Sequence, residues 1–305
     1  MQILIRKLII ILVLILIGYV GARRGFFSRS FTKTASSLTM NVLLTGTVLS
    51  SVMGELPELS GPEFARMFLI SCSCMLIMGI VGFLCALPFR KNRDKVSIVE
   101  FLSSTPNIMF IAAPLVQELY GAQGLFYIVV STIPFNFFVY TYGVWLVAHG
   151  GEGRKLELRD ILTLPFLASI LALFIALLRL PTPPVLRDLC SIIGGATVPM
   201  SMFVIGATLG EVELKSAFAQ PLSYAASLVR LIICPVVIYL ALRPFAMDPV
   251  LFNAMIINAA SPSAVIVAVF AIQYDRDAEF AAEGILVSVL LSVVTIPIIS
   301  SMLLV

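Results

Sequence analysis

Long apolar runs alternate with short polar clusters along the whole chain. Most runs are about as long as the 20 residues that a helix needs to cross the hydrocarbon core of a bilayer. Glycine, proline and clusters of charge separate the runs and mark where one helix ends and the next begins. The pattern predicts ten transmembrane helices, at residues 3–22, 31–53, 64–88, 96–118, 124–148, 158–179, 185–210, 221–243, 250–273 and 278–303.

The composition agrees with this prediction. Hydrophobic residues make up 60% of the 305 residues and charged residues only 12%. The apolar runs are continuous and do not alternate with period two, so an outer-membrane β-barrel is not expected. The net charge of +3 lies mostly in short loops, which gives no support to nucleic-acid binding. We therefore expect an all-α integral membrane protein in the lipid bilayer of the inner (plasma) membrane.

Cysteine usage and the N-terminal run change this picture little. The number of cysteines is odd and no CxxC pair occurs, so we interpret them as small packing residues rather than as disulfides or metal ligands. The first run starts with Arg6 and Lys7, as a signal peptide would, but no small-residue cleavage site follows it. It is expected to remain as the first helix. All five cysteines fall inside apolar runs: Cys72, Cys74, Cys85, Cys190 and Cys234.

The two halves of the chain share a pattern of punctuating residues. A shift of 156 residues lays residues 151–305 on residues 1–150, with five predicted helices in each half. Agreement of several such positions at one shift indicates an internal repeat. Because five is odd, the second repeat must enter the membrane inverted, which is typical of secondary transporters. The matching pairs are Arg23 with Arg179, Gly54-Glu55 with Gly210-Glu211, Pro88-Phe89 with Pro244-Phe245, Pro106 with Pro262, and Gln117 with Gln273.

Lysine and arginine are unevenly divided between the two sides of the predicted membrane. The loops and helix ends of one side carry thirteen of them, against six on the other side. Cytoplasmic loops carry the excess of Lys and Arg in membrane proteins. Both termini are therefore predicted to lie on the non-cytoplasmic side.

Two of the predicted helices contain a break in their middle, at SSTPN in residues 96–118 and at NAASPS in residues 250–273. Pro106 and Pro262 each remove a backbone donor and disrupt the helix. In hydrocarbon, irregular backbone persists only where protein or a cavity surrounds it. Matching breaks in two inverted halves point to a binding site near the bilayer midplane. The alternative is a pair of kinks that serve packing.

The breaks also predict the kind of ligand. A helix that restarts after a break presents free N–H groups and the positive end of its dipole, which favour an anion. We therefore predict a site for a small organic anion at the two breaks. The candidate residues are Thr105, Pro106, Asn107, Asn258, Ser261, Pro262 and Ser263.

Three stretches resemble one transporter family. SSTPNIMFIAAPLVQELYGAQG resembles the fourth span of the auxin efflux carrier family, ATVPMSMFVIGATLGEVEL its seventh span, and SPSAVIVAVFAIQYDRDAEFAAEGILVSVLLSVVTIPI its ninth and tenth spans. The resemblance covers essentially the whole chain. It implies a bacterial-type member of the bile/arsenite/riboflavin transporter superfamily, with ten helices in two inverted five-helix repeats and crossed broken helices 4 and 9.

The resemblance also implies a mechanism and a substrate class. Spans 3–5 and 8–10 would form a transport domain that moves like an elevator against a scaffold of spans 1, 2, 6 and 7. The substrates would be small organic anions, such as malate or auxin-like monocarboxylates, and the protein would form a homodimer through its scaffold helices. One departure concerns span 2, TMNVLLTGTVLSS, which lacks a proline in the place that Pro199 occupies in span 7. Asn41 in this span is a further candidate for the site.

Ionisable and amide groups inside the predicted membrane are further candidates, because such groups are costly there and usually have a function. Arg230, near the centre of span 8, is either a counter-ion for a carboxylate or a structural arginine bonded to backbone carbonyls. Glu100 and Glu283 are candidates for H⁺ or Na⁺ coupling, unless they face interfacial water. Gln117 and Gln273 either line the path or cap the half-helices.

Glycines in the predicted scaffold, among them Gly18 and Gly206, are expected to permit close helix approach, within or between subunits. Other function classes have less support. The single histidine, His149, occurs with no HExxH or GxSxG motif, so an enzyme is not expected, and neither is a cofactor. A membrane sensor that binds a ligand without moving it remains an alternative to the transporter.

Overall fold

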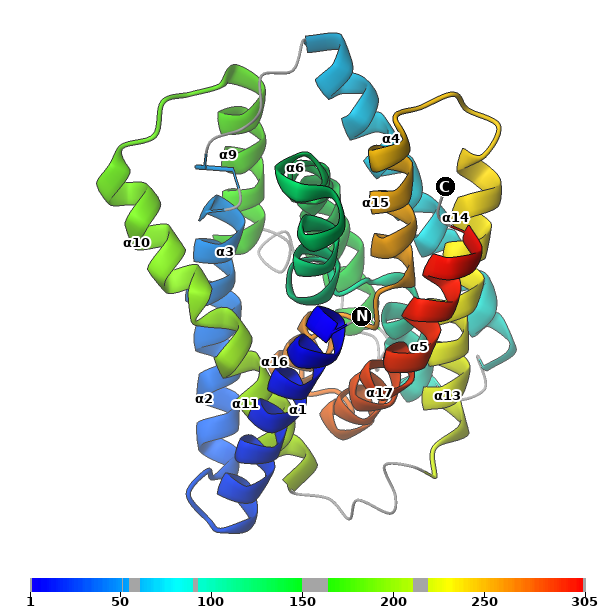
Figure 1. The fold of residues 1–305 in the computed structure, drawn as a ribbon. Coiled ribbons are helices and arrows are strands. Elements are labelled where there is room, and N and C mark those ends of the chain that lie inside the picture. Colours follow the sequence, from blue (N-terminus) through cyan, green and yellow to red (C-terminus); the bar gives the residue numbers. More distant parts are fainter. Residues whose placement is uncertain are drawn as a thin grey trace.

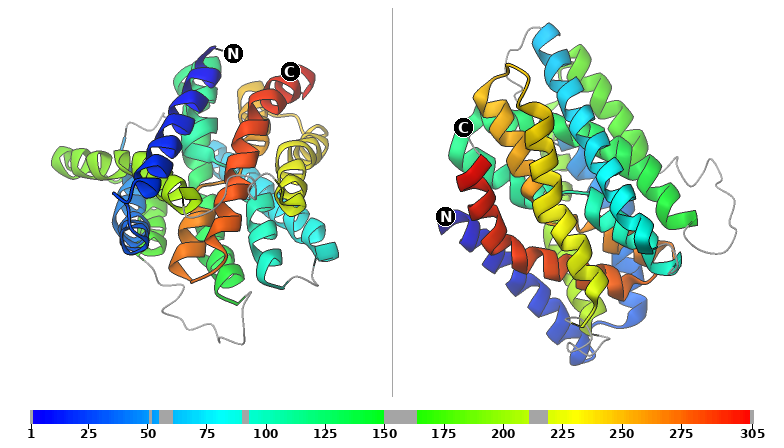
Figure 2. Two further views of the ribbon diagram at one scale, coloured as in Figure 1. Left: turned by 90° about the horizontal axis from the view of Figure 1, so that it is seen from below. Right: turned by 90° about the vertical axis from the view of Figure 1, so that its right-hand side faces the viewer.

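The protein is helical in the computed structural model, which describes residues 2–50, 52–54, 61–89, 93–149, 164–210 and 219–303. In these residues every regular element is a helix, apart from one isolated antiparallel bridge between Pro106 and Ser263. Figures 1 and 2 show a bundle in which α2, α3, α9 and α10 lie together on one side, and α4, α13 and α14 on the other.

The elements follow one another as below. The first half contains α1 (Gln2–Arg23), α2 (Arg29–Leu38), η1 (Thr39–Leu43), α3 (Leu44–Ser50), α4 (Gly61–Ala86), η2 (Leu87–Phe89), α5 (Arg93–Ser104), η3 (Ile108–Ala112), α6 (Ala113–Phe138), η4 (Val139–Gly143) and α7 (Val144–His149). The second half contains α9 (Leu164–Leu178), α10 (Pro184–Gly195), α11 (Thr197–Gly210), α13 (Pro221–Leu228), η5 (Val229–Ile233), α14 (Cys234–Leu242), α15 (Pro249–Ala260), α16 (Ile266–Gln273) and α17 (Ala278–Leu303).

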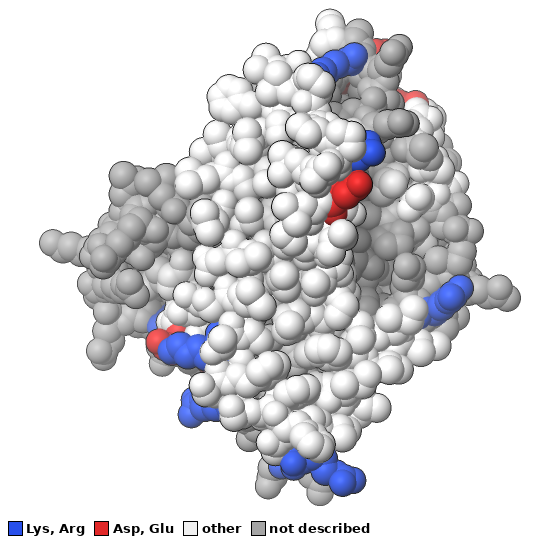
Figure 3. All heavy atoms as spheres, turned by 90° about the vertical axis from the view of Figure 1, so that its left-hand side faces the viewer, with Lys and Arg blue, Asp and Glu red and all other residues white. Residues whose placement is uncertain are grey.

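Helix length and apolar surface show a multi-pass helical membrane protein. Five continuous stretches are long and apolar enough to cross a bilayer: Gly61–Phe89, Gln123–Ala148, Pro184–Gly210, Pro221–Leu242 and Ala278–Leu303. Shorter apolar helices cover Leu12–Arg23 and Pro249–Ala260. On the face in Figure 3, charged side chains lie mainly toward the two ends, and much of the surface between them is uncharged. Such a band is what hydrocarbon requires.

Glycines bring α1 and α11 into close contact. A Cβ added at Gly206 would collide with the carbonyl oxygen of Ile15 and would lie 2.8 Å from the amide of Tyr19. A Cβ added at Gly18 would lie 2.9 Å from the Cα of Phe203. Small residues allow this backbone approach, which supplies packing where lipid gives no hydrophobic driving force. These two glycines thus serve helix contact within the subunit.

The second predicted span and the seventh differ in the way that the sequence indicates. The seventh is interrupted at Ala196, between α10 and α11, with Pro199 in the first turn of α11. The second continues from α2 through the π-helical turn η1 into α3 without a break. The two pack against each other at Gly46 and Gly194, where the hydroxyls of Thr47 and Thr197 lie 2.8 Å apart.

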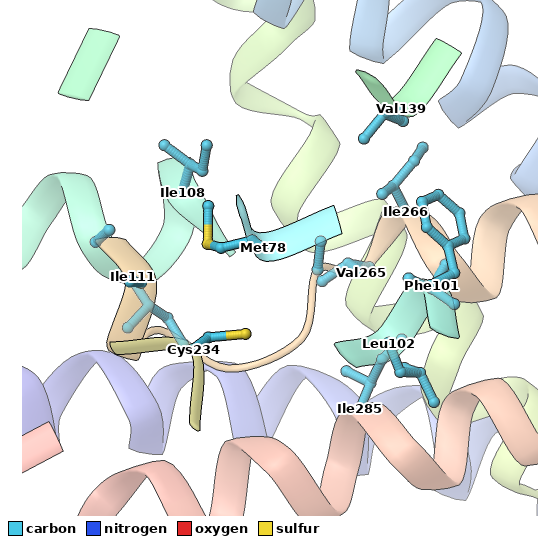
Figure 4. Packing of buried hydrophobic residues seen from close by; sticks show 14 of the residues in the cluster. Met78, Phe101, Leu102, Ile108, Ile111, Val139, Cys234, Val265, Ile266 and Ile285 are labelled. Carbon is cyan, nitrogen blue, oxygen red and sulfur yellow. The ribbon is translucent and has the colours of Figure 1, made fainter. Parts of the chain in front are cut away.

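Buried apolar side chains from both halves form the main core around the two chain breaks. Met78, Phe101, Cys234 and Val265 come from four separate elements and lie around this region in Figure 4. The rings of Phe101 and Phe270 lie 5.7 Å apart. The core therefore holds together the segments that carry the predicted site.

Substitution of Gly206 by alanine is expected to destabilise the protein. The added methyl group meets backbone that cannot move aside without shifting a helix, so we expect a loss of about 1–3 kcal/mol in the free energy of unfolding. Unfolding by SDS in detergent micelles measures this change. Gly195→Ala is the matched control, because no atom lies within 4 Å of its added Cβ. Equal stability of the two variants would show that α1 and α11 are not held in close contact.

Candidate functional site

The two chain breaks meet and satisfy each other's backbone groups. Helix α5 ends at Ser104 and α15 ends at Ala260. Between the helices, the amide of Asn107 donates to the carbonyl of Pro262 at 2.8 Å, and the amide of Ala264 donates to the carbonyl of Thr105 at 2.9 Å. This short antiparallel pairing explains how both breaks persist in hydrocarbon, since each provides the partners that the other lost.

Side-chain hydroxyls reinforce the pairing. The hydroxyl of Ser263 donates to the carbonyl of Leu102 at 2.8 Å, and the amide of Ser263 donates to the hydroxyl of Ser288 at 3.1 Å. The hydroxyls of Thr105 and Ser261 donate to carbonyls one turn earlier in their own helices. All of these side chains are buried. The polar residues beside the prolines therefore fix the backbone of the breaks.

Arg230 lies on the side of the crossing where the two helices end. Its side chain is fully buried. The Nε donates to the carbonyl of Ser261 at 3.0 Å, and Nη1 donates to the carbonyl of Ser104 at 3.3 Å. Nη2 donates to the carbonyls of Asn258 and Ala259. Of the two roles considered for Arg230, this geometry is that of an arginine bonded to backbone carbonyls.

A cavity lies on the opposite side, where the helices restart. Its volume is about 70 Å³, and it is bounded by both breaks and by helices α3 and α11. Each of the two restarting segments contributes three consecutive residues, and hydroxyl and amide side chains line the remainder together with apolar ones. The lining consists of Leu44, Thr47, Val48, Pro106, Asn107, Ile108, Thr132, Phe135, Asn136, Thr197, Ser201, Ala264, Val265, Ile266 and Val269.

Three hydrogen-bond donors in this lining lack an acceptor within the part of the chain that the structure describes. The side-chain Nδ2 of Asn107 is buried and has no hydrogen-bond partner. The backbone amides of Val265 and Ile266, at the start of α16, also have no acceptor there. Unpaired donors at a helix N-terminus favour a negatively charged ligand. No lysine or arginine lines the cavity.

The other amide candidates lie outside the cavity lining. Asn41 donates to the carbonyl of Ser37 at 2.9 Å, within its own helix. Gln117 is exposed near the start of α6, and Gln273 is half-buried at the end of α16. Asn258 is buried on the Arg230 side, and its Oδ1 has no donor among the residues with described positions.

The two membrane carboxylates are both buried but differ in their partners. Glu100 accepts a hydrogen bond from the hydroxyl of Tyr142. Glu283 is only 1% exposed, and neither of its oxygens has a hydrogen-bond partner in the described residues. The nearby Lys95 instead lies 3.7 Å from Asp277. Neither carboxylate lines the cavity, so any role in coupling would be exerted from outside it.

Several lining residues were not predicted from the sequence. Thr132 and Asn136 flank Pro134 in α6, and Thr197 and Ser201 flank Pro199 in α11. In both places a proline inside an apolar helix stands next to polar residues, as it does at the two breaks. This shared signal could have identified them. Thr47 carries no such signal.

Sequence comparison agrees with this arrangement. The model of the membrane transport protein family matches residues 3–160 and 152–300. The chain belongs to this family. The resemblance to the auxin efflux carriers is thereby confirmed, and this membrane transport protein is a transporter rather than an enzyme.

Relatives of this membrane transport protein are themselves named as transporters. It is 27% identical over 297 residues to an "Uncharacterized transporter" of Methanothermobacter thermautotrophicus, with 94% of each chain covered. It is 24% identical over 301 residues to "Uncharacterized transporter YfdV" of Escherichia coli, again with 94% of each covered. A "Putative malonate transporter" of Rhizobium meliloti is 34% identical over 159 residues, or 50% of this chain and 49% of that protein.

Replacing Glu283 by glutamine is expected to stabilise the protein. The amide keeps the shape of the side chain and costs less to bury than a carboxylate without a hydrogen-bond partner. We expect a gain of about 1–3 kcal/mol in the free energy of unfolding, measured in SDS titrations. The exposed Glu279, one turn earlier in α17, gives the control Glu279→Gln, which should change stability little. A loss of stability in Glu283→Gln would show that the carboxylate is paired.

Proposed function

We propose that the protein is a secondary transporter of small organic anions, which bind in the cavity beside Asn107. The observation that carries the proposal is the convergence of three unpaired donors on this cavity: Asn107 Nδ2 and the amides of Val265 and Ile266. Backbone amides at a helix start and a neutral side-chain donor can hold a carboxylate without a cationic side chain. An apolar ligand would leave these donors unsatisfied.

The volume of the cavity favours a small carboxylate. A water molecule needs about 10–15 Å³ measured in the same way, so a cavity of about 70 Å³ holds on the order of five waters. Malonate and malate are of this size, whereas an auxin-like carboxylate with an indole ring needs a wider cavity. The relative from Rhizobium meliloti, whose name includes malonate, supports the same class of substrate.

The proposed architecture is ten transmembrane helices in two inverted repeats, residues 1–150 and 151–305. Helices occupy the described part of each of the ten segments that the sequence predicts. Pro106 and Pro262, which the shift of 156 residues pairs, both lie at the meeting point of the breaks. This arrangement corresponds to inverted repeats whose broken helices cross at the binding site.

The proposed mechanism is alternating access of the elevator type. Thr47 and Ser201 reach the cavity from the second and seventh spans, which belong to the proposed scaffold. Asn107 and Val265 reach it from the fourth and ninth spans, which belong to the proposed transport domain. A ligand bound between them would travel with the transport domain as it slides along the scaffold.

The surroundings of the transporter are proposed on the same basis. Both termini lie on the non-cytoplasmic side of the inner membrane, because Lys and Arg are concentrated in the opposite loops. A homodimer forms through the scaffold, where α10 exposes the apolar residues Val185, Leu189 and Ile192. Coupling to H⁺ or Na⁺ is decided by the gradient experiment below.

Substitution of Asn107 by alanine is expected to reduce carboxylate uptake at least tenfold. Removing a hydrogen bond to a charged group costs about 1.5–3 kcal/mol, which is about tenfold or more in affinity. Uptake of labelled malonate and malate into liposomes that hold the purified protein measures this, with the H⁺ gradient, the Na⁺ gradient and the membrane potential imposed one at a time. Asn41→Ala is the control, because Asn41 bonds within its own helix.

The outcomes separate the candidate functions. Saturable uptake that falls in Asn107→Ala and persists in Asn41→Ala supports a carrier that uses this cavity, and the gradient that drives uptake identifies the coupling. Binding of malonate without uptake under any gradient would indicate the sensor. Uptake that is equal in both variants would move the substrate site away from Asn107.

A further inference from the structure

Five backbone carbonyl groups converge on Arg230 at the crossing. They belong to both halves of the chain, because α5 and α15 end side by side at this point. Together they form what we call the carbonyl cage. Its members are the carbonyls of Ser103, Ser104, Asn258, Ala259 and Ser261.

A cage of this kind requires a cation. The last carbonyls of a helix lack intrahelical donors and carry the negative end of the helix dipole. Here two such ends face each other in the interior, away from water and from lipid headgroups. Carbonyl oxygens arranged in this way bind monovalent cations in membrane proteins. The side chain of Arg230 is fully buried in the middle of this group.

The local structure of the eighth span aims Arg230 into the carbonyl cage. Arg230 lies in the π-helical turn η5, and Pro235 follows in the first turn of α14. Because proline has no N–H, the helix before it need not keep regular bonding, and a wider turn is accommodated. The Met78 sulfur lies 3.4 Å from both Nη1 and Nη2 and closes the remaining side.

We propose that the carbonyl cage is a monovalent-cation site that Arg230 fills from within the chain. The guanidinium is a resident cation, so the crossing forms without dissolved Na⁺ and anion transport does not require Na⁺ at this place. Arginine suits the cage because it offers five donors in a planar fork, whereas lysine offers three at a single nitrogen.

The resident cation also affects the anion cavity. The cage and the cavity lie on opposite sides of the same crossing, and Asn107 and Ala264 belong to the segments between them. Without a positive charge, the negative ends of α5 and α15 would oppose an anion at the restarting helices. Arg230 neutralises these ends and leaves the positive ends of the restarting helices to act on the ligand.

Chemical rescue tests the proposal without any anion substrate, so its result is independent of the proposed transport function. Arg230→Ala empties the cage and is expected to unfold at a lower temperature than the parent protein. Millimolar guanidinium chloride should raise the midpoint of Arg230→Ala in a saturable way, and NaCl should raise it by a smaller amount, both relative to choline chloride. The parent protein and the exposed control Arg243→Ala should not respond. Absence of rescue, or equal shifts in all three proteins, would overturn the proposal.

A second pair of variants decides the matter if Arg230→Ala does not fold. Arg230→Lys keeps a charge in the cage, whereas Arg230→Met keeps the length of the side chain without one. We expect the lysine variant to be less stable than the parent but more stable than the methionine variant, or to fold where the methionine variant does not. A methionine variant as stable as the lysine variant would show that the cage needs no cation.

Discussion

The absence of water in the bilayer interior is the constraint on which this structure depends. Two helices stop and restart inside the membrane, and each stop frees backbone groups that would be costly in hydrocarbon. The chain solves this by placing the two interruptions against each other, so that Asn107 bonds to Pro262 and Ala264 bonds to Thr105. Neither break could exist alone in this form, and the surrounding helices pack so that both are enclosed.

The crossing also sorts charge without many charged side chains. Both helices that stop direct their carbonyl ends to Arg230, and both that restart direct their amide ends to the cavity. One cation on one side and unpaired donors on the other follow from the direction of the backbone. This explains how a cavity with no lysine or arginine in its lining can still attract an anion.

The sequence predicted the features that carry a local signal and missed those that depend on how helices face one another. The prolines at 106 and 262, with their polar neighbours, gave the position of both breaks. The facing of Thr132 and Asn136 could not be derived, because helices that are apolar on all sides show no periodicity. The role of Arg230 was left open because its partners are distant in sequence, with Ser103 127 residues before it. Asn41 appeared equivalent to a site residue until its bond to Ser37 was seen.

The bonding within and between the two groups of helices bears on how such a transporter can move. The breaks are tied together by backbone hydrogen bonds, which favours motion of α5, α15 and α16 as one rigid unit. Contacts from this unit to the second span include the Ser36 hydroxyl on the carbonyl of Val269 at 3.1 Å and an exposed Lys33–Asp275 ion pair at 2.9 Å. An exposed pair contributes about 1 kcal/mol or less, and a single hydroxyl bond contributes a similar amount. Because the cavity lies on this weakly bonded boundary, sliding along it would change access to the ligand while leaving its donors in place.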